Sequence, residues 1–231
     1  MKAFIFDFNG TMVMDSYMHE IAWRHYVEML CGRDVSDEEF IKHVHGKTSA
    51  MILEHFLGGK KLSRDEVMQY SEEKEQYYRN LCLENKERFH LTEGLIEVLD
   101  RAKEMGIPMA IATAANLANI DFYFEYFELD KWFDRKNVIY DDGTLQGKPD
   151  PDIYLRAMET LNMKPEDCVV FEDAVSGVIS AHRAVAGKIV GVYGDSSREL
   201  LEATKVVDLC IRDFREQDSM KEIFEYCFDK L

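Results

Sequence analysis

Hydrophobic and polar positions follow two different patterns along the chain. Residues 2–7 form a short apolar run that ends in the carboxylate of Asp7, which predicts a buried parallel strand. Residues 15–86 carry helix signals instead. For example, Ser63 is followed three residues later by Glu66, the spacing of a capping box. The first strand is therefore expected to lead into a long, all-helical segment.

After Thr92 the pattern alternates between strands and helices. Apolar runs predict strands at 108–113, 138–140, 168–171 and 189–192. Amphipathic repeats predict helices at 95–102, 116–127, 150–161 and 175–186. Repeated strand–helix units indicate an α/β fold, a doubly wound, Rossmann-like parallel sheet with helices on both faces. The expected domains are an α/β core of residues 1–14 and 88–231 and an inserted all-helical cap of residues 15–87.

Composition and charge narrow the classes of partner. The 231 residues include 28 Lys and Arg against 44 Asp and Glu, a net charge of −16. Such acidity argues against nucleic acid as a partner, but a locally positive pocket could still bind a small phosphorylated metabolite. Apolar residues at the start stop at Asp7, and no run approaches the length of a membrane-spanning helix. With five scattered cysteines and no Cys-x-x-Cys pair, we expect reduced thiols in a cytoplasmic, monomeric protein without membrane association.

Polar side chains gather at the predicted carboxyl ends of the strands, where open parallel sheets bind ligands. Asp7, Thr113 and the pair Glu172-Asp173 each end a strand, and Lys148 precedes a helix. Carboxylates bind Mg²⁺, whereas lysine, hydroxyl and helix-terminal amides bind phosphate oxygens. An aspartate can also form an acyl phosphate. These residues predict a Mg²⁺-dependent phosphoryl-transfer site.

Four motifs in this order resemble the haloacid dehalogenase-like superfamily, in the branch with a helical cap after the first strand. They are Asp7-Phe-Asn9-Gly-Thr11, Thr113, Lys148 within Gly-Lys-Pro-Asp-Pro-Asp, and Glu172-Asp173. Within this superfamily the chain is most similar to β-phosphoglucomutase-like and sugar-phosphatase-like members.

The resemblance implies a role for each motif residue. Asp7 would be the nucleophile, and Thr113 and Lys148 would grip the phosphoryl oxygens. Asp7, Asp173 and the backbone carbonyl of Asn9 would hold Mg²⁺, with Glu172 in or near the metal shell.

Asn9 departs from the family, in which this position is an aspartate that protonates the leaving oxygen and activates the acceptor. An amide cannot exchange a proton at neutral pH, and losing such help typically costs about 10²–10⁴ in rate. Three explanations stay open: a natural variant with slow or differently assisted chemistry, a protein that binds phosphate esters without turnover, and an engineered substitution that traps complexes. A fourth idea is deamidation of Asn9-Gly10 to restore the aspartate, which a rigid backbone opposes.

The expected substrate-binding residues come from both parts of the chain. His19, Trp23 and Lys74 match positions that contact substrate in β-phosphoglucomutase-like caps. Lys47 precedes Ser49, which stands where the mutase pattern has an arginine. Beside Thr113, the residues expected to contact substrate are Ala114 and Asn116. The missing arginine and Asn9 favour a phosphohydrolase of small sugar or polyol phosphates, with a β-phosphoglucomutase-like phosphotransferase or a catalytically impaired phosphate-ester-binding protein as the alternatives.

Overall fold

The computed structural model describes residues 2–44, 47–194 and 197–228. By its internal contacts the chain divides into two compact units. The first, here called the sheet unit, consists of residues 1–14 and 90–231. The second, here called the helical unit, consists of residues 15–89.

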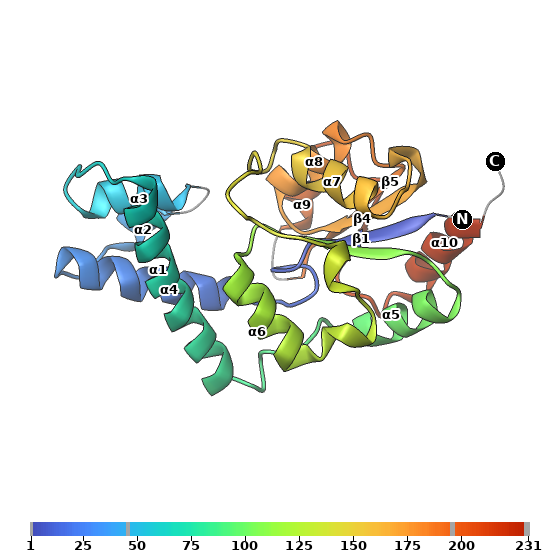
Figure 1. Ribbon diagram of the computed structural model, residues 1–231, viewed down its shortest axis with the longest axis horizontal. Coiled ribbons are helices and arrows are strands. Elements are labelled where there is room, and N and C mark those ends of the chain that lie inside the picture. The colour runs from blue at the N-terminus through green and yellow to red at the C-terminus, as the bar shows by residue number, and fades with distance from the viewer. Residues whose placement is uncertain (1, 45–46, 195–196, 229–231) are drawn as a thin grey trace. The chain divides into compact units, whose positions relative to one another are not determined.

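Among the residues that the structure describes, the sheet unit has six strands in the order β3-β2-β1-β4-β5-β6 (Figure 1). All neighbouring strands are parallel; for instance, Ile5 of the first strand lies opposite Ala110 on one side and Val170 on the other. The strands are β1 (Ala3–Phe6), β2 (Met109–Ala112), β3 (Val138–Ile139), β4 (Cys168–Glu172), β5 (Lys188–Val192) and β6 (Leu209–Ile211). The first strand is central, so its carboxyl end lies in the middle of the sheet's edge.

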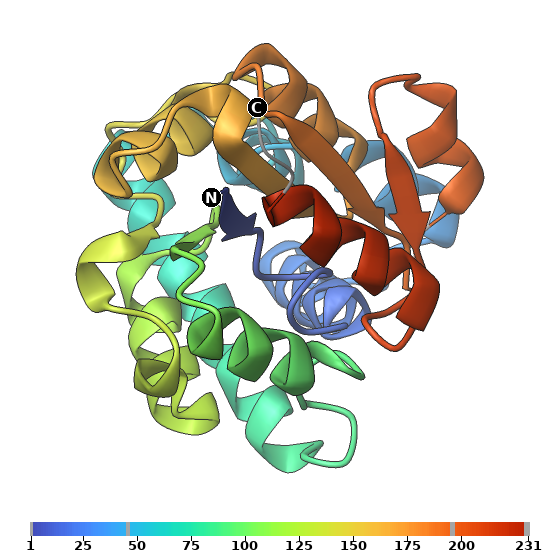
Figure 2. The same ribbon diagram turned by 90° about the vertical axis from the view of Figure 1, so that its right-hand side faces the viewer.

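Helices cover both faces of this sheet. Helices α7, α8 and α9 lie on one face, and α5, α6 and α10 lie on the other (Figures 1 and 2). Their bounds are α5 (Leu95–Glu104), α6 (Leu117–Phe127), α7 (Asp152–Thr160), α8 (Val175–Arg183), α9 (Arg198–Ala203) and α10 (Gln217–Phe228). Short 3₁₀ turns lie at Leu129–Lys131, Arg135–Asn137 and Pro165–Asp167.

The two faces of β1 bury different side chains. Ala3 and Ile5 belong to an apolar cluster with residues of α7 and α8. Phe4 and Phe6 point the other way, where the Phe6 ring stacks on that of Phe171 with centroids 4.6 Å apart. Because successive strand residues alternate between faces, a wholly apolar strand such as β1 must be covered on both sides.

This architecture confirms the predicted fold class, a parallel α/β sheet with helices on both faces. Each strand and helix expected between residues 92 and 192 is present, with ends shifted by a few residues. The structure also contains β6, α9 and α10, which are not among the predicted elements. The sixth strand has only three residues and α9 only six, too short for a periodic pattern to stand out.

In its described residues the helical unit has four helices, and an apolar cluster joins the first three of them. The helices are α1 (Ser16–Cys31), α2 (Asp37–His43), α3 (Ser49–Phe56) and α4 (Arg64–Glu84). Val27, Phe40 and Ile52 are among the buried residues of this cluster. Ser63 caps α4, and the reciprocal bond from Glu66 completes the expected capping box. In the part of the chain that the structure describes, none of these or the other helices is both long and apolar enough to cross a membrane.

Candidate active site

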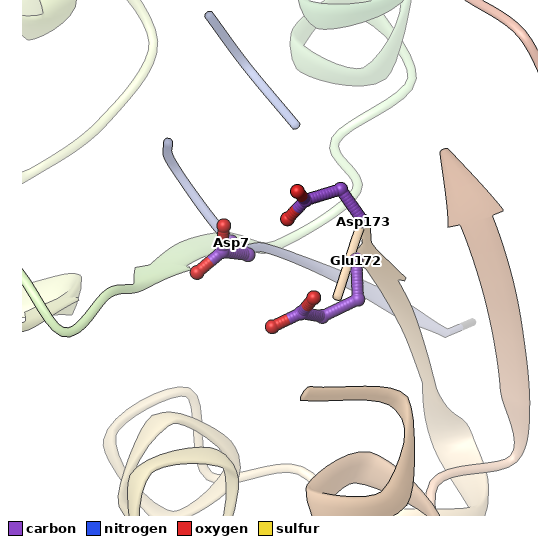
Figure 3. A group of neighbouring side chains, drawn as sticks. All are labelled: Asp7, Glu172 and Asp173. Carbon is purple, nitrogen blue, oxygen red and sulfur yellow. The ribbon is translucent and has the colours of Figure 1, made fainter. Parts of the chain in front are cut away.

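Three neighbouring strands bring the candidate catalytic residues to one edge of the sheet. Asp7 directly follows β1, Thr113 follows β2, and Glu172 ends β4 before Asp173. Because these strands lie in the order β2-β1-β4, their carboxyl ends are adjacent. Figure 3 shows the carboxylates of Asp7, Glu172 and Asp173 directed toward a common space.

Lys148 provides the positive charge of this group. Its Nζ donates to Asp7 Oδ1 and to Glu172 Oε1, both at 2.6 Å, and lies 3.5 Å from the carbonyl oxygen of Ala112. The side chains of Lys148, Asp7 and Glu172 are only 11%, 9% and 1% exposed. A buried ammonium between two carboxylates is a fixed point charge in a low-dielectric site.

Acidic groups outnumber basic ones in this cluster, because three carboxyl groups lie near one ammonium group. Burial and the nearby Glu172 raise the pKa of Asp7 to about 7, although Lys148 opposes the rise. Burial, Glu172 and Asp7 likewise raise the pKa of Asp173 well above its ordinary value. Burial lowers the pKa of Lys148, but Asp7 and Glu172 outweigh it and the pKa lies above its usual range. Lys148 therefore stays charged, and the cluster favours an additional cation.

The donor set fits Mg²⁺. Asp7, Glu172 and Asp173 each offer a carboxylate oxygen, and these oxygens lie within 4.8 Å of one another. Such hard oxygen ligands are those that Mg²⁺ prefers. The loop after β1 approaches closely, because a Cβ added to Gly10 would lie 2.1 Å from Asp173 Oδ2. Gly10 also has a φ of +82°, so glycine alone suits this position on both counts.

Glu172 is held by more donors than the motif suggests. Besides Lys148, the hydroxyl of Tyr154 donates to Oε1 at 3.1 Å, and the backbone N–H of Ala174 donates to Oε2 at 2.7 Å. Sequence reasoning missed Tyr154, because a buried tyrosine on the inner side of α7 has the same pattern as an ordinary core residue. Glu172 thus orients Lys148 and lies beside the other two carboxylates.

Asn9 directs its side chain toward α6. Its Nδ2 donates to the hydroxyl oxygen of Tyr123 at 2.9 Å. Sequence reasoning also missed Tyr123, which is fully buried among aromatic residues and gives no signal of its own.

The residues after β2 have mainly local partners. Thr113 is buried, and its hydroxyl oxygen accepts from the backbone N–H of Ala115 at 3.1 Å. Asn116 is the N-cap of α6, where its side-chain oxygen accepts from Asn119 N at 2.9 Å. Ala114 is exposed.

The helical unit brings together three of its four expected substrate-binding residues. Lys74 Nζ lies 3.2 Å from His19 Nδ1, 2.5 Å from a Glu75 oxygen, and 5.1 Å from the centre of the Trp23 ring. Lys74 is almost fully buried, although a lysine on a cap helix is usually exposed. Lys47 instead lies on an exposed segment before α3.

Two further residues, Asp15 and Tyr78, support this cluster in the helical unit. The Tyr78 hydroxyl donates a short hydrogen bond to Asp15, and its ring stacks on His19 with centroids 3.8 Å apart. Burial, followed by the charge of Lys74, lowers the pKa of His19, so its neutral form is favoured. Sequence reasoning did not find this pairing, which joins residues at opposite ends of the helical segment.

Comparisons with known proteins agree with the fold and the motifs. The chain is 31% identical over 210 residues to a phosphorylated carbohydrates phosphatase of Thermotoga maritima, covering 89% of this chain and 93% of that protein. It is 30% identical over 198 residues to a β-phosphoglucomutase of Bacillus subtilis, covering 83% of each.

A solved structure and a family model complete the comparison. A haloacid dehalogenase hydrolase of family IA from Entamoeba histolytica superposes with a TM-score of 0.88 at 33% identity, covering 97% of this chain and 100% of that chain. The family model described as haloacid dehalogenase-like hydrolase matches residues 1–184. With motif order, sheet and family model in agreement, this chain belongs to the haloacid dehalogenase-like hydrolase family.

Proposed function

We propose that this chain is a Mg²⁺-dependent phosphohydrolase of small phosphorylated carbohydrates that acts through an aspartyl phosphate on Asp7. The observation that carries the proposal is the position of Lys148 Nζ, 2.6 Å from both Asp7 Oδ1 and Glu172 Oε1. A fixed cation beside the attacking carboxylate lets an anionic phosphate ester approach. The names of the two similar proteins, a phosphatase of phosphorylated carbohydrates and a β-phosphoglucomutase, support this substrate class.

The proposed reaction has two steps. In the first, a carboxylate oxygen of Asp7 bonds to phosphorus while the ester P–O bond breaks, and the leaving alkoxide takes up a proton from solvent. In the second, water bonds to the phosphorus of phospho-Asp7, the acyl-phosphate bond breaks, and phosphate and a proton leave. Lys148 and Thr113 are the residues proposed to hold the phosphoryl oxygens through both steps.

The metal has a defined place in this proposal. Asp7, Glu172, Asp173 and the backbone carbonyl of Asn9 would hold Mg²⁺, which offsets the charge of the phosphoryl oxygens when bound.

Asn9 sets the expected rate. Its amide cannot give or take the proton that both steps require, and general acid–base help is typically worth about 10²–10⁴-fold. Because ester binding needs neither step, phosphorylation of Asp7 only the first, and release of phosphate both, we expect binding and phosphorylation to be less impaired than release. The same residue favours the second candidate, a protein that binds phosphate esters without turnover. The other alternative is a phosphotransferase similar to the relative that is named a β-phosphoglucomutase.

The deciding experiment is phosphate release from a panel of phosphorylated sugars and polyols, with Mg²⁺ or with a chelator. It is run on the wild-type chain, Asn9→Asp and Asp7→Ala. The proposal expects Mg²⁺-dependent release that Asp7→Ala abolishes and that Asn9→Asp accelerates by about 10²-fold or more on some substrate. Equal, active rates for wild type and Asn9→Asp would contradict the assigned role of position 9. If neither the wild type nor Asn9→Asp releases phosphate, phosphoryl transfer or ester binding would remain as the function.

We extend the substrate-binding role to His19, Trp23, Lys47 and Lys74 of the helical unit and to Ala114 and Asn116 of the sheet unit. The proximity of Lys74, His19 and Trp23 supports this extension for those three. Lys74→Met is expected to raise KM for the phosphate ester more than it lowers kcat, because its charge would serve binding. An unchanged KM would exclude Lys74 from substrate contact.

A further inference from the structure

Tyr123 is a side-chain hydrogen-bond partner of Asn9, the residue that departs from the family pattern. Its hydroxyl oxygen lies 2.9 Å from Asn9 Nδ2, although the two residues are 114 positions apart. Asn9 lies just beyond β1, and Tyr123 lies in the second turn of α6. The fold itself therefore creates this contact, because β1 and α6 belong to the same unit.

The side chain of Tyr123 is held in place by close packing. It is 0% exposed, and its ring stacks on Phe8 with centroids 4.2 Å apart and an interplanar angle of 17°. The neighbouring Phe122 ring lies 5.7 Å away. Close packing of this kind fixes both rotatable bonds of the tyrosine, so the hydroxyl occupies a defined position.

The backbone around Asn9 is held as firmly. Gly10 N donates to Val13 O at 2.7 Å, and Met12 N donates to Phe8 O at 2.8 Å. Asn9 and Val13 also form an isolated β-bridge. With the backbone fixed, the remaining freedom at position 9 is rotation of the side chain, which the hydrogen bond to Tyr123 restricts.

We propose that Tyr123 is a positioning residue for the side chain at position 9. This inference rests on the proposed function, and it gives Asn9 a role in the reaction. In this proposal the hydrogen bond from Nδ2 to Tyr123 fixes the orientation of the amide, and the carbonyl Oδ1 accepts a hydrogen bond from the attacking hydroxyl of water or a sugar. An amide oxygen accepts a hydrogen bond but takes no proton. The proton of the attacking hydroxyl therefore passes to solvent while its oxygen bonds to phosphorus and the acyl-phosphate bond breaks.

The first test does not depend on turnover. Hydrogen exchange of the Asn9 side-chain amide is followed by NMR in ¹⁵N-labelled wild-type protein, Tyr123→Phe and Tyr126→Phe. Tyr126 lies on the same helix and is the matched control for loss of a hydroxyl. Tyr123→Phe is expected to speed exchange by about 2- to 10-fold, the worth of one hydrogen bond, whereas Tyr126→Phe leaves it unchanged. Unchanged exchange in Tyr123→Phe would overturn the proposal.

The second test asks whether this contact matters for the reaction. In the wild-type and Asn9→Asp backgrounds, Tyr123→Phe is expected to lower kcat by about 2- to 10-fold and to leave KM for the phosphate ester unchanged. A fall in kcat matched by Tyr126→Phe, a change in KM, or a rise in kcat would each overturn the positioning role. If every variant lacks Mg²⁺-dependent phosphate release, the proposed function fails, while the exchange result still decides whether Tyr123 holds Asn9.

Discussion

At the scale of single residues, Lys148 balances the charge of the candidate active site. It is a buried cation within 2.6 Å of Asp7 and Glu172, and Asp173 lies in the same cluster. We expect Lys148→Met to destabilise the metal-free protein by about 3–5 kcal/mol, because removing one partner leaves uncompensated charge in a buried site. Urea unfolding without Mg²⁺ measures this loss.

The control for this prediction is Lys136→Met. Lys136 pairs with Asp134 and is 74% exposed, so its loss is expected to change the free energy of unfolding by less than about 1 kcal/mol. Similar losses in the two variants would mean that the buried carboxylates do not depend on Lys148 for their stability.

The second prediction at this scale concerns deamidation of Asn9 in the Asn9-Gly10 sequence. Deamidation requires the Gly10 nitrogen to attack the side-chain carbonyl carbon of Asn9. In the fold, Gly10 N donates to Val13 O and Asn9 Nδ2 donates to Tyr123. We therefore expect the folded protein to keep Asn9, and peptide mass spectrometry after incubation at mildly alkaline pH to detect no 1-Da increase there. Protein incubated in urea is the positive control, and equal deamidation in both samples would contradict this reasoning.

Motif residues and supporting residues differ in how far sequence predicts them. Asp7, Lys148 and Glu172 could be identified because each stands at a strand end or helix start with a recognisable spacing, and the structure brings them together. Tyr154 and Tyr123 could not, because a buried tyrosine reads as core and its partner is set by long-range packing. Sequence therefore indicates which groups could react, whereas the structure is needed to find the groups that orient them.

At the scale of elements, the packing of α8 against the end of β4 constrains the site. A Cβ added to Gly177 would lie 1.7 Å from Glu172 Oε1, so the helix can approach this carboxylate only with glycine there. Within a helix, alanine is otherwise favoured over glycine by about 1 kcal/mol.

Gly177→Ala is thus expected to destabilise the protein in spite of its better helix propensity, by about 1–3 kcal/mol as for other overpacked sites. It should also weaken Mg²⁺ binding, because Glu172 must move. Calorimetric unfolding and Mg²⁺ titration measure the two effects. Gly147→Ala, whose added Cβ meets nothing within 4 Å, is the control. If Gly177→Ala is more stable than the wild type, the Glu172 side chain can move away from the added methyl group without loss of stability.

The elements themselves could be predicted where their pattern is long or their boundary is marked. The strand at 108–113 is predicted by an apolar run and the helix at 116–127 by an amphipathic repeat, and they appear as β2 and α6. The last strand, β6, could not be found this way, because three residues are too few to show a periodic hydrophobic pattern. It is recognised as a strand by its pairing with β5.

At the scale of the whole molecule, the chain has two units with separate apolar cores. The sheet unit holds the acidic cluster of Asp7, Glu172 and Asp173, and the helical unit is stabilised by its own cluster around Phe40. A ligand that binds only the native state stabilises what it binds, by about 2.7 kcal/mol at a concentration of 100 Kd. Mg²⁺ should therefore act on the sheet unit.

Hydrogen exchange with peptide resolution tests this expectation. Mg²⁺ is expected to slow exchange in peptides that cover β1 and β4, and to leave α2 and α3 of the helical unit unchanged, because local stability follows the cooperative unit. Asp173→Asn should remove the effect by taking away one carboxylate of the cluster. Equal slowing in α2 and α3 would show that the two units unfold as one, and no slowing in β1 and β4 would show that the three carboxylates do not bind Mg²⁺.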